Sequence, residues 1–122
     1  MPPPTSALLP DGTPVDLNAL AVTVTERHLQ RHPEDTERYG ELVWAWCVHD
    51  TQHLMAWGVG DLDLAGQLRW LASVLDARGY PVANLFDCVL TCASVLSHEL
   101  GPGADTAAWR MEDAARELAP GL

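Results

Sequence analysis

A chain of 122 residues is long enough to bury one hydrophobic core and too short for two ordinary domains. Its hydrophobic content of 48% is that of a globular protein rather than a disordered one. The formal net charge of −10 argues against a partner that is a nucleic acid or an anionic membrane surface. The lack of lysine and isoleucine is typical of a bacterial protein from a GC-rich genome.

Nothing in the sequence reads as a membrane span or a leader. No apolar run approaches the roughly 20 residues that a membrane-spanning helix needs, and no charged-then-apolar segment opens the chain. We therefore expect a soluble, cytoplasmic protein.

Residues 1–15 are rich in proline, and we expect them to form a turn-rich arm ahead of one helical domain at 16–122. Beyond the arm, apolar residues recur with helical spacing, and no stretch shows sustained strand alternation. The first helix should begin after an N-cap at Asp16 and end before Pro33. Its apolar stripe comprises Leu17, Leu20, Ala21, Val24 and His28.

The second predicted helix runs from about Pro33 to Gly58–Gly60 and would be roughly 36 Å long, the longest element and the centre of the bundle. One arc of this helix carries Tyr39, Leu42, Trp46, His49, Asp50, His53 and Trp57. A second apolar strip on the opposite side carries Trp44, Val48 and Met55. We interpret the second strip as an interface, which favours a homodimer.

Three further helices are expected in the second half of the chain. The third begins at Asp61 or Asp63 and ends at Gly79, the fourth spans about 82–100, and the fifth runs from about 105 to 118. Short connections join them, so the sequence predicts an all-α fold, a compact bundle of about five helices.

The segment from Trp44 to Trp57 is the strongest candidate for a site. His49 and His53 are one helical turn apart, which is the spacing that binds a metal from one face of a helix. Two imidazoles do not make a site, and His28, Cys92 or Glu99 could add ligands only if the packing brings them close. The metal therefore stays unknown, with His49 and His53 as candidates.

Two other interpretations of the same segment remain open. A planar cofactor could stack on Trp46 and Trp57, with His53 as its ligand or hydrogen-bond partner and Asp50 orienting the imidazole. Alternatively, His53 is a neutral core histidine and the indoles are packing residues. His28 and His32 repeat the spacing on the first helix, where we expect a structural role.

The three cysteines are Cys47, Cys88 and Cys92, and their odd number argues against a disulfide framework. We expect buried thiols, with a thiolate ligand or a covalent cofactor anchor as the alternative. No G-x-S-x-G, phosphate loop or G-x-G-x-x-G occurs, so we do not expect an enzyme.

From Asp50 to Pro81 the chain reads Asp-Thr-Gln-His-Leu, then Gly-Asp at 60–61, then Leu-Arg-Trp-Leu-Ala-Ser-Val-Leu-Asp-Ala-Arg-Gly-Tyr-Pro at 68–81. This pattern resembles the helical input modules of bacterial signalling and regulatory proteins, which can precede cobalamin-binding, STAS or kinase domains. The resemblance covers about residues 27–100. It implies a helical fold, a sensing role, and pattern positions at Asp50, His53, Trp70 and Arg78-Gly79.

Together these observations predict a small sensory module that binds a planar ligand between the second helix and the Cys92 face of the fourth. A tetrapyrrole (haem, bilin or cobalamin) is the first class to test. The site residues would be His53, Trp46, Trp57, His49, Asp50 and Cys92. Such a module would signal through a homodimer or a downstream protein partner. The alternatives are a cofactor-free interaction protein or structural dimer, and a metal-dependent enzyme.

Overall fold

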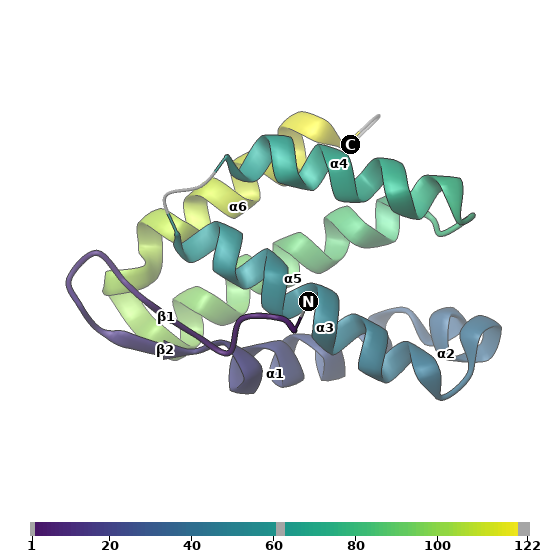
Figure 1. The fold of residues 1–122 in the computed structure, drawn as a ribbon, viewed down its shortest axis with the longest axis horizontal. Helices are drawn as coiled ribbons and strands as arrows, with labels where there is room; N and C mark the ends of the chain where they lie inside the picture. Colours follow the sequence, from purple (N-terminus) through teal and green to yellow (C-terminus); the bar gives the residue numbers. More distant parts are fainter. Residues whose placement is uncertain (1, 61–62, 120–122) are drawn as a thin grey trace.

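A computed structural model describes residues 2–60 and 63–119. It is an all-α fold preceded by a two-stranded hairpin (Figure 1). The helices are α1 (Leu17–Arg31), α2 (Pro33–Tyr39), α3 (Leu42–Val59), α4 (Leu64–Ala77), α5 (Val82–Leu100) and α6 (Asp105–Leu118), with a 3-10 turn η1 (Gly101–Ala104) before α6. None of these helices is both long and apolar enough to cross a membrane.

The predicted N-terminal arm contains an antiparallel hairpin. β1 (Ser6–Leu8) pairs with β2 (Pro14–Asp16), and Ala7 lies opposite Val15. Each strand has only three residues, which is too short for an alternating pattern to stand out in the sequence. Leu9 and Val15 are buried and join the hydrophobic core, so the hairpin covers one end of the helices.

The first helix agrees with its prediction. The carboxylate of Asp16 accepts a hydrogen bond from the Ala19 amide, which is the expected N-cap, and α1 ends one residue before His32-Pro33. All five residues of the predicted stripe are buried: Leu17, Leu20, Ala21, Val24 and His28.

The prediction of a single long second helix is wrong, because the chain breaks at Gly40. This residue has φ 73° and ψ −157°, a backbone conformation that is essentially restricted to glycine. Its amide still bonds the Thr36 carbonyl and so closes α2, and α3 starts at Leu42 in a new direction. The short helix α2 therefore folds over the N-terminal half of α3 instead of extending it.

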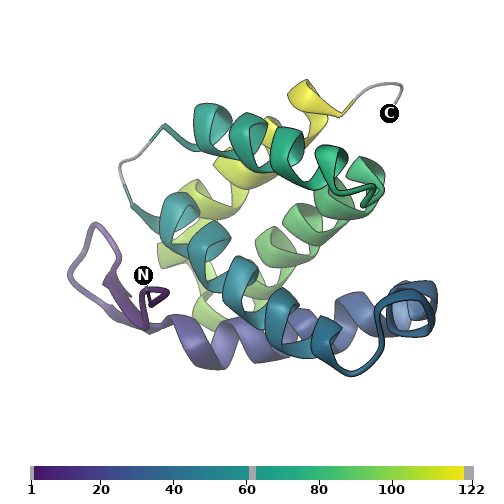
Figure 2. The same cartoon turned by 45° about the vertical axis from the view of Figure 1, so that its right-hand side comes forward.

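The last three long helices lie close to the predicted ranges. Asp63 caps α4 by accepting a hydrogen bond from the Gly66 amide, and Gly79 and Gly101 follow α4 and α5 with positive φ. In Figures 1 and 2, α5 runs through the middle of the molecule. It packs against α1, α3, α4 and α6, and its buried side chains form much of the core.

The break at Gly40 can be tested by Gly40→Ala. No atom lies within 4 Å of an added Cβ, so the cost comes from the backbone conformation alone. We expect the free energy of unfolding to fall by about 1–3 kcal/mol in chemical denaturation. Ala in place of the adjacent exposed Glu41 should change it by less than about 0.5 kcal/mol. Equal stability of Gly40→Ala and the wild type would contradict the assigned conformation.

Candidate functional site

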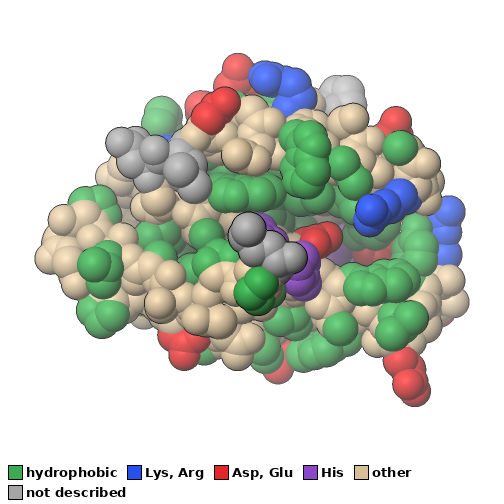
Figure 3. Space-filling model, in the orientation of Figure 1, with side chains coloured by type: hydrophobic (Ala, Val, Ile, Leu, Met, Phe, Trp, Pro, Cys, Tyr) green, Lys and Arg blue, Asp and Glu red, His purple; other side chains and the backbone are tan. Residues whose placement is uncertain are grey.

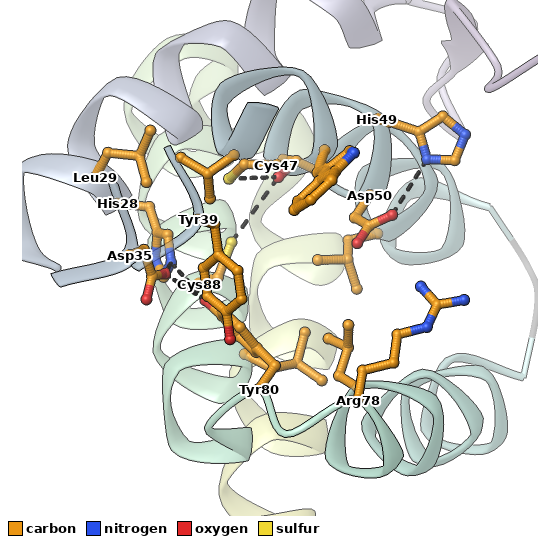
Figure 4. A pocket seen from close by; sticks show the side chains of 16 residues that line it. His28, Leu29, Asp35, Tyr39, Cys47, His49, Asp50, Arg78, Tyr80 and Cys88 are labelled. Atoms are coloured by element: carbon orange, nitrogen blue, oxygen red, sulfur yellow. Dashed lines mark hydrogen bonds and ion pairs between the residues drawn. The ribbon is translucent and has the colours of Figure 1, made fainter. Parts of the chain in front are cut away.

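A cavity of about 460 Å³ lies where α1, α2, α3 and α5 meet the end of α4. Its volume falls within the range of roughly 300–1,000 Å³ that small-molecule sites occupy. Most of its wall is apolar, and polar side chains enter from several of these elements (Figure 4). Seen from one side of the molecule, histidine and acidic side chains lie beside a hollow that hydrophobic side chains surround (Figure 3).

A hydrogen-bonded group of three buried or half-buried side chains forms the closed end of the cavity. The hydroxyl of Tyr80 donates to the Asp35 carboxylate at 2.6 Å, and His28 Nε2 lies 3.3 Å from that hydroxyl and 3.4 Å from the carboxylate. Asn84 on α5 donates a further bond to Asp35 at 3.2 Å. This network connects α1, α2, the segment after α4, and α5.

Two polar atoms at this end of the cavity are buried without a hydrogen-bond partner. They are Nδ1 of His28 and the hydroxyl oxygen of Tyr39. A buried polar group without a partner destabilises a fold by about 1–3 kcal/mol, so such groups call for an explanation. Both side chains line the cavity, and a bound ligand or water could satisfy them.

Burial shifts the protonation of the groups at the closed end. Burial lowers the pKa of His28, although the nearby carboxylate of Asp35 acts in the opposite direction. Burial also raises the pKa of Tyr80, and its hydrogen bond to Asp35 adds to this effect. At neutral pH the cavity therefore presents a neutral imidazole and a neutral phenol.

Two thiols contribute to the cavity wall from facing helices. Cys47 on α3 and Cys88 on α5 each lie 3.9 Å, sulfur to oxygen, from the hydroxyl of Thr51. The Cys88 thiol and burial raise the pKa of Cys47. The pKa of Cys88 is also raised, by the Cys92 thiol and by complete burial, although Cys47 acts to lower it. A reactive cysteine needs a lowered pKa, so these two thiols are suited to packing rather than to nucleophilic attack.

The open end of the cavity is more polar and carries charge. His49 and Asp50 approach from α3, where His49 Nδ1 lies 3.2 Å from the Asp50 carboxylate, and Arg78 approaches from the end of α4 (Figure 4). The indole of Trp46 lines the wall between the two ends, and 51% of this residue remains exposed.

The cavity contains three of the six site residues that we predicted. Trp46, His49 and Asp50 line it, whereas His53, Trp57 and Cys92 do not. The His53 ring packs between those of His49 and Trp57, with centroid distances of 5.0 and 6.0 Å. Asp50 is hydrogen-bonded to His49, and not to His53 as we expected. Cys92 is fully buried in the core. Cys88, one helical turn away on α5, lines the cavity where we expected Cys92.

Two structural observations bear on the metal and interface predictions for α3. In the part of the chain that the structure describes, His49 and His53 do not join a group of three or more potential metal ligands. The predicted interface strip is interrupted, because Met55 is completely buried against the core. Trp44 is 40% exposed and Val48 is half-buried, so only the first half of the strip reaches the surface.

The sequence pattern did not reveal most of the closed end. Asp35, Tyr39 and Tyr80 were not predicted as site residues, and His28 was expected at a core position and as a possible additional metal ligand. One available signal was the spacing of His28 and His32, because histidines beside an apolar stripe of a helix need polar partners. Nothing local in the sequence links that stripe to the residues after α4.

A second cluster lies beside the cavity, where the end of α1 meets α5. His32 Nε2 lies 2.6 Å from Asp87 Oδ2, its Nδ1 lies 2.9 Å from Glu34, and Arg31 bonds both oxygens of Asp87 at 2.8 and 3.1 Å. Burial acts to lower the pKa of His32, but the two carboxylates outweigh it and raise that pKa. Burial acts to raise the pKa of Asp87, but His32 and Arg31 outweigh it and lower that pKa.

The two tyrosines of the cavity provide a matched test of the network. Tyr80→Phe removes a 2.6 Å bond to a buried carboxylate, so we expect a loss of about 1–3 kcal/mol in the free energy of unfolding. Tyr39→Phe removes a buried hydroxyl that has no partner, so it should not lower the free energy of unfolding and should raise it by up to about 1–3 kcal/mol. Denaturant titration of both variants measures the difference, and equal losses would contradict the network.

No protein-family model, no curated protein and no solved structure matches this chain. A function for this protein therefore has to be inferred from the geometry of the site.

Proposed function

We propose that this protein is a small regulatory module that binds a planar, partly apolar ligand in the cavity between α1, α3 and α5. The observation that carries the proposal is the lining of the cavity. Its wall is mostly apolar, yet its closed end holds two buried polar atoms without partners, His28 Nδ1 and the Tyr39 hydroxyl. A ligand that supplies a hydrogen bond at that end would remove the desolvation cost of the Tyr39 hydroxyl.

The shape of the wall favours a flat ligand. The aromatic rings of Tyr39 and Trp46 meet edge to face at 6.3 Å, and the Tyr39 and Tyr80 rings lie 6.0 Å apart. Aromatic rings of this kind stack on planar ligands and add to the energy of burial. At the mouth, Arg78 can pair with an anionic edge of the ligand, while His49 offers an imidazole.

Tetrapyrroles remain the first ligand class to test, because they combine a flat apolar body with polar edges and a preference for an imidazole partner. In this proposal His49 at the mouth takes the role that we expected of His53. The resemblance to bacterial input modules supports a sensing role of the same kind.

Two neighbouring tryptophans allow a controlled experiment. Purified protein is mixed with haem, a bilin or cobalamin and followed by visible absorbance and by quenching of tryptophan fluorescence. Trp46→Ala removes an indole from the wall and should weaken binding about tenfold or more, since a stacked aromatic ring and its buried area contribute more than 1 kcal/mol. Trp44→Ala, two residues away and outside the cavity, should leave the affinity unchanged.

Two outcomes would contradict the proposal. If none of the three compounds changes the absorbance or the fluorescence, the tetrapyrrole class is wrong. If a general planar dye such as ANS binds equally well to the wild type and to Trp46→Ala, the cavity is not the ligand site.

A cofactor-free interaction module is the second candidate, and the exposed tryptophans favour it. Trp44, Trp70 and Trp109 are 40%, 59% and 63% exposed, which is unusual for the largest apolar side chain. In that case Trp44→Asp should change the oligomeric state in gel filtration with light scattering. Neither the wild type nor Trp46→Ala should then bind any of the three compounds.

A further inference from the structure

The end of α1 and the facing side of α5 bring together three side chains that commonly bind metals. One ring nitrogen of His28, one of His32 and one carboxylate oxygen of Asp87 lie within 4.8 Å of one another. We propose that these residues form a binding site for a divalent transition metal of the zinc type. The site goes beyond the proposed ligand function and does not depend on it.

The backbone holds the two imidazoles in the required arrangement. His28 and His32 are one turn apart on α1, and their ring centroids are separated by 4.7 Å. Asp87 approaches from α5, and its Oδ2 lies 2.6 Å from His32 Nε2. His28 and Asp87 lie on helices, and His32 directly follows the last residue of α1. Rigid elements of this kind hold metal ligands precisely.

A carboxylate lies beside each of the two rings. His32 Nδ1 lies 2.9 Å from Glu34, which leaves Nε2 directed at Asp87. His28 Nε2 lies near Asp35 and Tyr80, while its Nδ1 is buried with no partner. In metal sites, the histidine ligands typically donate their second N–H to a carboxylate in this way, which fixes the ring and strengthens it as a ligand.

Arg31 opposes the binding of a cation here. Its guanidinium bonds both oxygens of Asp87, and its positive charge disfavours a second cation nearby. However, the Arg31 side chain is 61% exposed and can turn toward solvent. Asp87 can then present an oxygen to a metal.

The ligand set selects the class of metal. Two imidazoles and one carboxylate suit Zn²⁺, Co²⁺ or Ni²⁺, and three protein ligands leave a coordination position for water or for another molecule. Mg²⁺ and Ca²⁺ prefer sites in which every ligand is oxygen. The chain therefore should bind Zn²⁺ in preference to Mg²⁺.

The experiment uses the full chain without a histidine tag, stripped of metal by a chelator. Zn²⁺ is titrated in competition with a chromophoric chelator, and Co²⁺ is followed by its visible absorption. We expect one equivalent of tightly bound Zn²⁺, a rise in Tm on adding Zn²⁺ but not Mg²⁺, and at least about tenfold weaker binding in His32→Gln and in Asp87→Asn. Both residues are partly exposed, so these variants should fold, which far-UV circular dichroism checks.

Two further variants separate a metal site from a purely structural ion-pair cluster. Arg31→Gln removes the competing positive charge and should tighten Zn²⁺ binding several-fold, whereas a structural cluster would show no change in Zn²⁺ affinity. His49→Gln and His53→Gln are the matched controls, because this pair has the same spacing on α3 and joins no three-ligand group in the described part of the chain. Both controls should bind Zn²⁺ as the wild type does.

Three results would overturn the proposal. They are the absence of Zn²⁺ binding, binding that is equally strong in the wild type, His32→Gln and Asp87→Asn, and binding that is lost only in the His49 or His53 variant. The second result would assign the ion to surface carboxylates of this acidic chain. Because Trp46→Ala tests the ligand cavity and leaves these ligands in place, the metal site and the ligand function can fail separately.

Discussion

The buried carboxylate of Asp35 is the interaction on which the architecture of this protein depends. It accepts hydrogen bonds from Tyr80 and Asn84, and it lies 3.4 Å from His28. These four side chains belong to α1, α2, α5 and the segment between α4 and α5. Without such partners a carboxylate that is 2% exposed would strongly disfavour folding. The short helix α2 therefore stays folded against the bundle because its one buried acid has donors there.

The same network creates the two candidate sites. On one side, Tyr80 and His28 contribute to the wall of the cavity, beside two buried polar atoms that have no hydrogen-bond partner. On the other side, the position of His28 sets the distance to His32 and Asp87. One buried histidine thus belongs to both sites, so binding at one can influence the other through the orientation of this ring. Such coupling would suit a module that converts binding into a signal.

The break at Gly40 separates two helices that the sequence pattern joined into one, and only half of the predicted site residues line the cavity. Apolar residues occur on both sides of residues 33–59, so the pattern did not distinguish one long helix from two helices packed on each other. α3 begins after Gly40 and buries Leu54 and Met55, and His53 and Trp57, farther along this helix than Trp46 and His49, do not line the cavity. Trp46, His49 and Asp50 remain beside the cavity because they lie on the part of α3 that α2 approaches.

The sequence by itself determined the helical class, the cap at Asp16, and the approximate ends of α1, α4, α5 and α6, because these depend on local spacing and capping chemistry. It left the start of α4 open between Asp61 and Asp63, and the structure shows the cap at Asp63. The sequence did not determine which polar residues meet. Tyr80 reaches Asp35 across 45 positions, and Asp87 reaches His32 across 55. Those contacts depend on how α2 and α5 pack around α1, and no local pattern encodes that packing. The tertiary structure alone therefore decided where the cavity closes and where the two histidines of α1 find their carboxylates.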